Sequence, residues 1–153
     1  MKDHKEETIE LASYPFFELG NHSWSHPDFA ALSSEEITEE IQKTQQQMFN
    51  ILGYQTHLFR FPFGTYSDTA LNTVQTNGLY AIQWDVESGD PDPNIDAPAM
   101  IDWVLYQAES GSIIIMHING RGWHTAEALP TLIETLQSQG YEFVTVSELT
   151  GLQ

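Results

Sequence analysis

The sequence has no cysteine and very few basic residues. Without cysteine, the chain can form no disulfide and cannot use a thiolate as a nucleophile or metal ligand. Only 5 lysines and arginines stand against 22 aspartates and glutamates, which gives a formal net charge of −17 with histidine neutral. Nucleic acids and anionic membranes are bound through clustered cations. We therefore expect no nucleic-acid partner, and a neutral or cationic partner fits better.

Long apolar runs are also absent. No stretch of about 18 apolar residues is present, so we expect no membrane span. The first ten residues, MKDHKEETIE, contain no apolar segment of the kind that signal peptides carry. The sequence does not identify the cellular compartment. With 41% hydrophobic and 12% aromatic residues, the 153-residue chain has the composition of a folded domain, and its length suits one domain over residues 1–153.

Short apolar runs alternate with segments of helical periodicity, which predicts an α/β fold with parallel strands and crossover helices. Ser33 and Glu36 form a capping-box pattern, so a helix is expected to begin there and to end at Gly53. Further helices are expected over 5–12, 68–76, 97–108 and 125–139, and strands over 16–20, 58–61, 79–84, 112–116 and 141–146. In such layered or barrel-like folds, functional residues follow the carboxyl ends of the strands.

Histidine, arginine and aspartate follow four consecutive predicted strands, within residues 21–27, 60–64, 84–90 and 117–120. His22 and His26 are four residues apart, so one helical turn would place both imidazoles at metal-chelating distance. They could equally be two partly exposed loop histidines. A zinc-like ion would need a further ligand, often a carboxylate, and spacing alone identifies none.

His117 is a candidate general acid or base, or a histidine that is simply hydrogen-bonded at a strand end. Arg60 lies between Phe59 and Phe61, and an arginine in such surroundings usually requires a carboxylate partner. Four acidic residues of the loop after the third strand could orient His117, pair with Arg60 or be solvated: Asp85, Glu87, Asp90 and Asp92.

These segments together resemble the polysaccharide deacetylase family, carbohydrate esterase family four, which includes chitooligosaccharide and peptidoglycan deacetylases. Residues 22–27 match the family pattern His-Ser/Thr-x-x-His-Pro, and residues 60–64 match Arg-x-Pro-Tyr/Phe-Gly. Residues 84–90 are similar to its Asp/Trp-rich segment, with Pro91 where tryptophan is usual, and residues 115–117 to its Leu-x-His motif. The likeness extends from about Glu18 to Leu149.

The resemblance implies a metal-dependent hydrolase that removes N-acetyl groups from a polysaccharide containing N-acetylglucosamine. A divalent metal, zinc in the first place, would be held by His22, His26 and an aspartate. It would polarise the acetamide carbonyl and lower the pKa of a bound water. The backbone N–H of Phe63 would help to hold the oxyanion.

The other roles that the resemblance implies fall on four residues. His117, oriented by Asp90, would protonate the leaving amine as general acid. Arg60 would orient the aspartate that acts as general base. Trp84, with neighbouring aromatic residues, would stack against sugar rings. The family is commonly exported.

The family's first motif is an Asp-Asp pair that supplies both the metal-binding and the base aspartate, and this sequence has no adjacent Asp-Asp. We therefore expect an incomplete, distorted (β/α) barrel of the polysaccharide deacetylase type that lacks its first strand–helix unit, roughly 30 residues. Its unpaired sheet edge could self-associate, and the isolated chain should be weakly active or inactive. Two alternatives stay open: a non-catalytic module that binds a glycan or a partner, and replacement of the aspartates by Asp85, Glu87 or Asp92.

Overall fold

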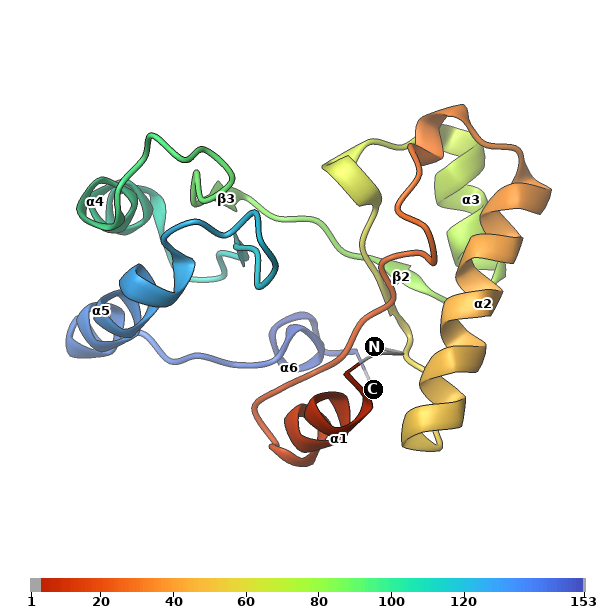
Figure 1. Cartoon of the computed structure of the whole chain (residues 1–153), viewed down its shortest axis with the longest axis horizontal. Coiled ribbons are helices and arrows are strands. Elements are labelled where there is room, and N and C mark those ends of the chain that lie inside the picture. The colour runs from red at the N-terminus through yellow and green to blue at the C-terminus, as the bar shows by residue number, and fades with distance from the viewer. Residues whose placement is uncertain (1–3, 153) are drawn as a thin grey trace. The chain divides into compact units, whose positions relative to one another are not determined.

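The described part of the chain consists mainly of helices, together with two pairs of short parallel strands. In the computed structural model, which describes residues 4–152, one compact unit ends at Gln83 and a second begins at Trp84. The first unit contains α1 (Lys5–Ser13), a 3-10 turn (Phe29–Ala31), α2 (Ser34–Leu52), β1 (Leu58–Phe59), a second 3-10 turn (Pro62–Gly64), α3 (Asp68–Thr76) and β2 (Tyr80–Ala81). The second contains β3 (Val86–Glu87), α4 (Ala97–Gln107), β4 (Ile114–Ile115), α5 (Thr125–Ser138) and α6 (Val146–Thr150) (Figure 1).

Helix α2 has the boundaries that its end signals predict. The Ser33 side chain accepts a hydrogen bond from the Glu36 N–H, and the Glu36 carboxylate accepts one from the Ser33 N–H, so the capping box is complete. Gly53 ends the helix in the left-handed conformation, at φ 80°, where a residue without a Cβ is least strained. This 19-residue helix is the longest of the described part, and no helix there is long and apolar enough to cross a bilayer.

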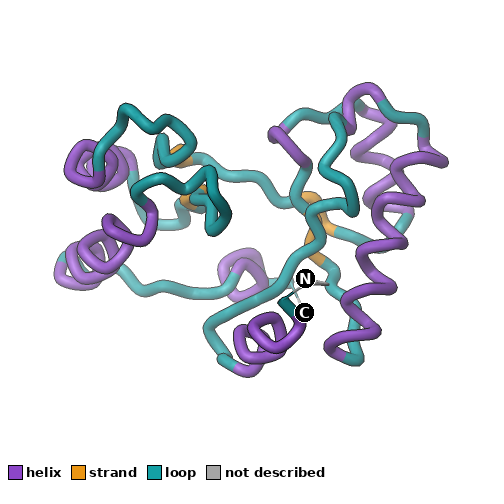
Figure 2. The backbone as a smooth tube through the Cα atoms, viewed as in Figure 1, coloured by secondary structure: helices purple, strands orange, loops and turns teal. Residues whose placement is uncertain are grey.

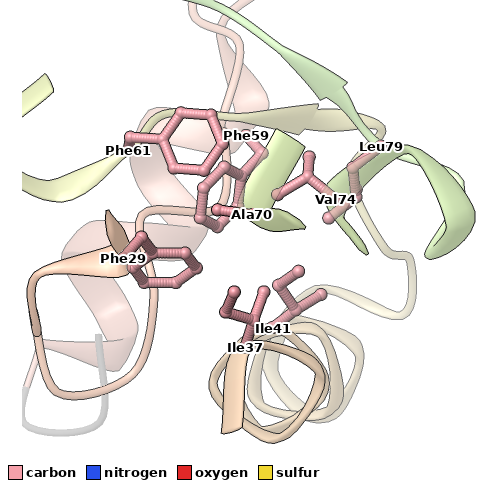
Figure 3. Packing of buried hydrophobic residues seen from close by; sticks show 8 residues of the cluster. All are labelled: Phe29, Ile37, Ile41, Phe59, Phe61, Ala70, Val74 and Leu79. Carbon is pink, nitrogen blue, oxygen red and sulfur yellow. The ribbon is translucent and has the colours of Figure 1, made fainter. Parts of the chain in front are cut away.

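The core of the first unit lies between α2, α3 and the β1–β2 pair. The two strands are parallel, with Leu58 opposite Tyr80 and Phe59 opposite Ala81. Asn21 adds a parallel bridge to Phe59, because its N–H donates to the Leu58 carbonyl and its carbonyl accepts from the Arg60 N–H. Figure 3 shows the buried side chains that pack here: Phe29, Ile37, Ile41, Phe59, Phe61, Ala70, Val74 and Leu79.

The second unit has its own small core under a second parallel pair. Val86 lies opposite Ile114 and Glu87 opposite Ile115. Helix α4 begins at Asp96, whose carboxylate accepts from the Ala99 N–H as expected of an N-cap. The buried apolar side chains of this core are Val86, Ala97, Met100, Val104, Ala128 and Leu132.

Two predicted strands are wrong. Residues 16–20 form no strand, because the rings of Tyr14, Phe16 and Phe17 contact one another around a turn closed by the Phe17 N–H and the Tyr14 carbonyl. Residues 141–145 are irregular, and the last residue of the predicted strand, Val146, begins a helix. Thr145 and Glu148 form a second capping box there.

The remaining strands are shorter than predicted, as the orange segments of Figure 2 show. The run 112–116 was expected to be buried on both faces, but only Ile114 and Ile115 are strand residues and both are half-buried. Within residues 4–152, β4 pairs with β3 alone, so one edge of it is left uncovered by another strand. Val86 and Glu87 form a strand that the sequence pattern did not predict.

Candidate functional site

His22 and His26 lie on a compact loop that its own polar side chains hold together. The Asn21 amide accepts from the Ser23 N–H (2.9 Å) and donates to the Ile41 carbonyl (3.1 Å). The Ser23 hydroxyl accepts from the His26 N–H (2.9 Å). Ser23 and His26 have φ values of 69° and 61°, so the loop is not the helical turn that the spacing suggested. The two imidazole centroids are nevertheless 5.0 Å apart.

A backbone carbonyl selects the tautomer of His22. Its Nδ1 lies 2.8 Å from the carbonyl oxygen of Arg60, and because that oxygen can only accept, Nδ1 carries the hydrogen. In the neutral ring, Nε2 is then the nitrogen with a lone pair available to a metal. Arg60 was expected to act through its side chain, and this contact of its backbone carbonyl was not predicted from the sequence. Burial lowers the pKa of the Arg60 guanidinium.

Phe63 occupies a strained turn beside the second histidine. Its φ is 59° in the 3-10 turn Pro62–Gly64, a conformation that L residues rarely adopt. The Phe63 side chain is 58% exposed, and its ring meets the His26 ring edge-on with centroids 4.6 Å apart. The turn therefore presents the aromatic ring of Phe63 next to the His26 ring.

Two further carboxylates hold this loop, and the sequence analysis assigned neither of them a role. Asp28 accepts from the Thr65 hydroxyl (2.6 Å) and so joins the histidine loop to the segment after Phe63. The Thr65 hydroxyl and the Ala30 N–H lower the pKa of Asp28. Glu40 of α2 accepts three hydrogen bonds from the residues between the histidines. No local spacing rule could have revealed it, since Glu40 is 14 positions from the nearer histidine.

In the second unit, Asp90 holds His117 in a defined orientation. Asp90 is 2% exposed, and its Oδ1 lies 2.9 Å from His117 Nδ1. Its Oδ2 accepts from the His117 N–H and from the Thr125 hydroxyl (2.8 Å). Burial raises the pKa of Asp90, but these hydrogen bonds outweigh burial and the net pKa lies below the ordinary value. The ionised carboxylate therefore accepts a hydrogen from Nδ1 and leaves Nε2 for proton exchange.

The other candidates of the second unit form hydrogen bonds within that unit. Trp84 is half-buried and its indole N–H lies 3.3 Å from a carboxylate oxygen of Glu87. Asp85 accepts from the Ser112 hydroxyl and the Ile113 N–H, and Asp92 closes a turn with Asn94. Through these hydrogen bonds, Asp85 and Asp92 stabilise the segments around them. Within residues 4–152, no three histidine, cysteine, aspartate or glutamate side chains are grouped to hold a metal ion.

The comparisons with known proteins agree on one family. The polysaccharide deacetylase family model matches residues 1–82, more than half of the chain. A peptidoglycan-N-acetylglucosamine deacetylase of Listeria monocytogenes is 37% identical over 134 residues, which are 88% of this chain and 28% of that protein. The chain thus spans less than a third of the length of this relative.

Two solved structures share the fold over nearly the whole chain. A family 4 acetyl xylan esterase from Clostridium thermocellum, in complex with a cobalt ion, gives a TM-score of 0.90 at 30% identity and covers 99% of this chain and 72% of its own. A pseudoenzyme of the same family from Bacillus anthracis gives 0.87 at 28% identity, covering 97% and 51%. The chain belongs to the polysaccharide deacetylase family and has the α/β fold of its members.

Proposed function

We propose that this chain provides the two-histidine part of a metal-dependent deacetylase that removes N-acetyl groups from a polysaccharide containing N-acetylglucosamine. The observation that carries the proposal is the pairing of the His22 and His26 rings, together with the Arg60 carbonyl that fixes the His22 tautomer. The deacetylase activity of the Listeria relative on a peptidoglycan sugar supports the substrate class.

His22 and His26 fit a divalent metal such as zinc, because both are imidazoles and the tautomer of His22 directs Nε2 to coordination. They make two ligands, whereas catalytic zinc usually has three from the protein. A bound divalent ion supplies Lewis acidity towards a carbonyl oxygen and a water. Because the chain has no adjacent Asp-Asp pair, we propose that on its own it binds metal weakly and has little or no deacetylase activity.

The chain's own residues would divide the rest of the work. The Phe63 N–H would stabilise the oxyanion, and Trp84 would contact a sugar ring. His117 would give its Nε2 proton to the leaving nitrogen, with the Asp90 carboxylate stabilising the imidazolium during the transfer. Arg60 would orient an aspartate base. We further propose that residues 1–153 form one domain of the distorted (β/α) barrel type, because the motifs of both units are those of one family.

Calorimetry with zinc tests the metal site directly. We expect the wild-type chain to bind zinc at least about tenfold more tightly than His22→Ala, since removing one of two ligands removes most of the affinity. His57→Ala is the matched control, because His57 is an exposed histidine of the same unit. Equal affinities of wild type and His22→Ala would contradict the metal site.

A second candidate function is a non-catalytic module that binds a glycan. It is favoured by the absence of a complete ligand set within residues 4–152, by the exposed rings of Trp24 and Phe63, and by the existence of a pseudoenzyme relative. Acetate release and calorimetry with N-acetylglucosamine oligomers separate the two. Chelator-sensitive acetate release would exclude a non-catalytic module and would also contradict the low activity proposed above. Oligomer binding heat with no release and no zinc binding favours the module, and no oligomer binding heat excludes it.

A further inference from the structure

The segment between the two histidines is bound by one carboxylate of helix α2. Glu40 Oε2 accepts from the backbone N–H groups of Trp24 (2.9 Å) and Ser25 (2.7 Å), and Oε1 accepts from the Ser25 hydroxyl (2.8 Å). Hydrogen bonds to an ionised acceptor are stronger than those between neutral groups. The only two residues between Ser23 and His26 are therefore both held by the same side chain.

The next residue of α2 fixes the other end of the loop. The Asn21 side chain is 1% exposed and donates to the carbonyl of Ile41, which follows Glu40 directly. Helix α2 is capped at its start by the capping box and at its end by Gly53, so positions 40 and 41 lie within a well-defined helix. The loop thus takes its shape from two consecutive residues of a helix to which neither histidine belongs.

We propose that Glu40 is a positioning residue that sets the separation and relative orientation of the His22 and His26 rings. Ser23 and His26 both have positive φ, a conformation that residues with a Cβ rarely adopt unless surrounding contacts impose it. The three hydrogen bonds to Glu40 and the two of Asn21 impose it here. The role of the ring pair in metal binding rests on the proposed function, whereas its geometry does not.

Two substitutions separate the hydrogen bonds of Glu40 from its charge. In Glu40→Ala all three bonds are lost, and the helix is retained because alanine has the highest helix propensity. In Glu40→Gln the amide oxygen can accept from both N–H groups and the amide nitrogen can donate to the Ser25 hydroxyl, so the contacts persist without the charge. Glu39→Ala is the matched control, since Glu39 is exposed, neighbours Glu40 and is paired with Lys43.

The first measurement needs no metal. In the full chain, the ring protons of His22 and His26 should show nuclear Overhauser contacts, because the centroids are 5.0 Å apart. We expect these contacts to be lost in Glu40→Ala and kept in Glu40→Gln and Glu39→Ala. Contacts that survive in Glu40→Ala, or that vanish equally in Glu40→Gln, would overturn the proposal.

The second measurement is zinc affinity by calorimetry. We expect Glu40→Ala to weaken binding roughly tenfold, the usual minimum effect of losing a group that orients metal ligands, and Glu40→Gln to stay close to wild type. Equal affinities of Glu40→Ala and Glu39→Ala would refute the role in metal binding. If the wild-type chain binds no zinc, the proposed function fails, and the ring contacts still decide the role of Glu40.

If Glu40→Ala does not fold, amide exchange in the wild-type chain decides. The Trp24 and Ser25 N–H groups lie in an exposed loop, so only the bonds to Glu40 would protect them. Slowed exchange of both supports the proposal, and exchange at the rate of an unstructured peptide overturns it.

Discussion

Asp90→Asn should reverse the tautomer of His117. In the wild-type chain, the Asp90 carboxylate accepts three hydrogen bonds, from the His117 N–H, from His117 Nδ1 and from the Thr125 hydroxyl. In the variant, the amide oxygen can still accept from the His117 N–H and the Thr125 hydroxyl. The amide NH₂ then faces Nδ1, which must give up its hydrogen and accept. The hydrogen of the neutral ring moves to Nε2, as expected when an amide replaces an orienting carboxylate.

The expected loss of stability follows from the same three bonds. A hydrogen bond to a charged group contributes about 1.5–3 kcal/mol and a neutral one about 0.5–1.5 kcal/mol, so three bonds lose about 3 kcal/mol in total. Part of this is regained because a neutral amide costs less to bury than a carboxylate. We expect a net loss of about 1–2 kcal/mol in the free energy of unfolding. For a chain of this length, that lowers the melting temperature by about 2–8 °C.

Long-range ¹⁵N–¹H correlation spectra of the imidazoles give the tautomer, and urea unfolding gives the stability. Asp92→Asn is the control, because Asp92 belongs to the same loop and its exposed carboxylate bonds to Asn94, away from His117. The reasoning is refuted if His117 of Asp90→Asn keeps its hydrogen on Nδ1 at wild-type stability.

Asp90→Asn also tests how the stability of the chain depends on pH. Because the folded-state pKa of Asp90 is depressed, its contribution to stability is complete above the unfolded pKa, roughly pH 4. It is lost as the pH falls through the folded pKa, when the carboxylate takes up a proton. Between pH 5 and 2, wild type should therefore lose more stability than Asp90→Asn, and parallel curves would contradict this assignment.

Three further outcomes are expected. Gly122→Ala should strongly destabilise the second unit, seen as a lower urea midpoint, because a Cβ there would collide with the His117 carbonyl oxygen and lie 2.7 Å from the Thr125 hydroxyl oxygen; an unchanged midpoint would contradict it. Thr125→Val should cost about 1.5–3 kcal/mol in urea unfolding through one lost hydrogen bond to the Asp90 carboxylate, with Thr125→Ser restoring it. Ser33→Ala should cost about 1 kcal/mol of helix stability by removing the cap on the Glu36 N–H, measurable by circular dichroism during thermal unfolding.

Much of the local structure was fixed by the sequence itself. The capping box of Ser33 and Glu36 and the stop at Gly53 are interactions between residues close in the chain, so α2 has the boundaries they predict. The histidine motifs were likewise identifiable by residue type and spacing. The ends of the strands could not be identified in this way, because strand pairing depends on a partner far away in the sequence. Residues 141–145 illustrate this: their apolar pattern suits a strand, yet the described chain gives them no ladder.

The way in which the motif residues are held depends on contacts between distant parts of the chain. By residue type and spacing, Asp85, Glu87, Asp90 and Asp92 were equal candidates to orient His117, and the family resemblance implied Asp90. The burial of Asp90 against Thr125 distinguishes it, since a carboxylate is buried only where donors compensate its lost hydration. Likewise, His22 and His26 are brought together by a loop bonded to Glu40 of a helix. Those bonds join residues far apart along the chain, and spacing rules describe only neighbours.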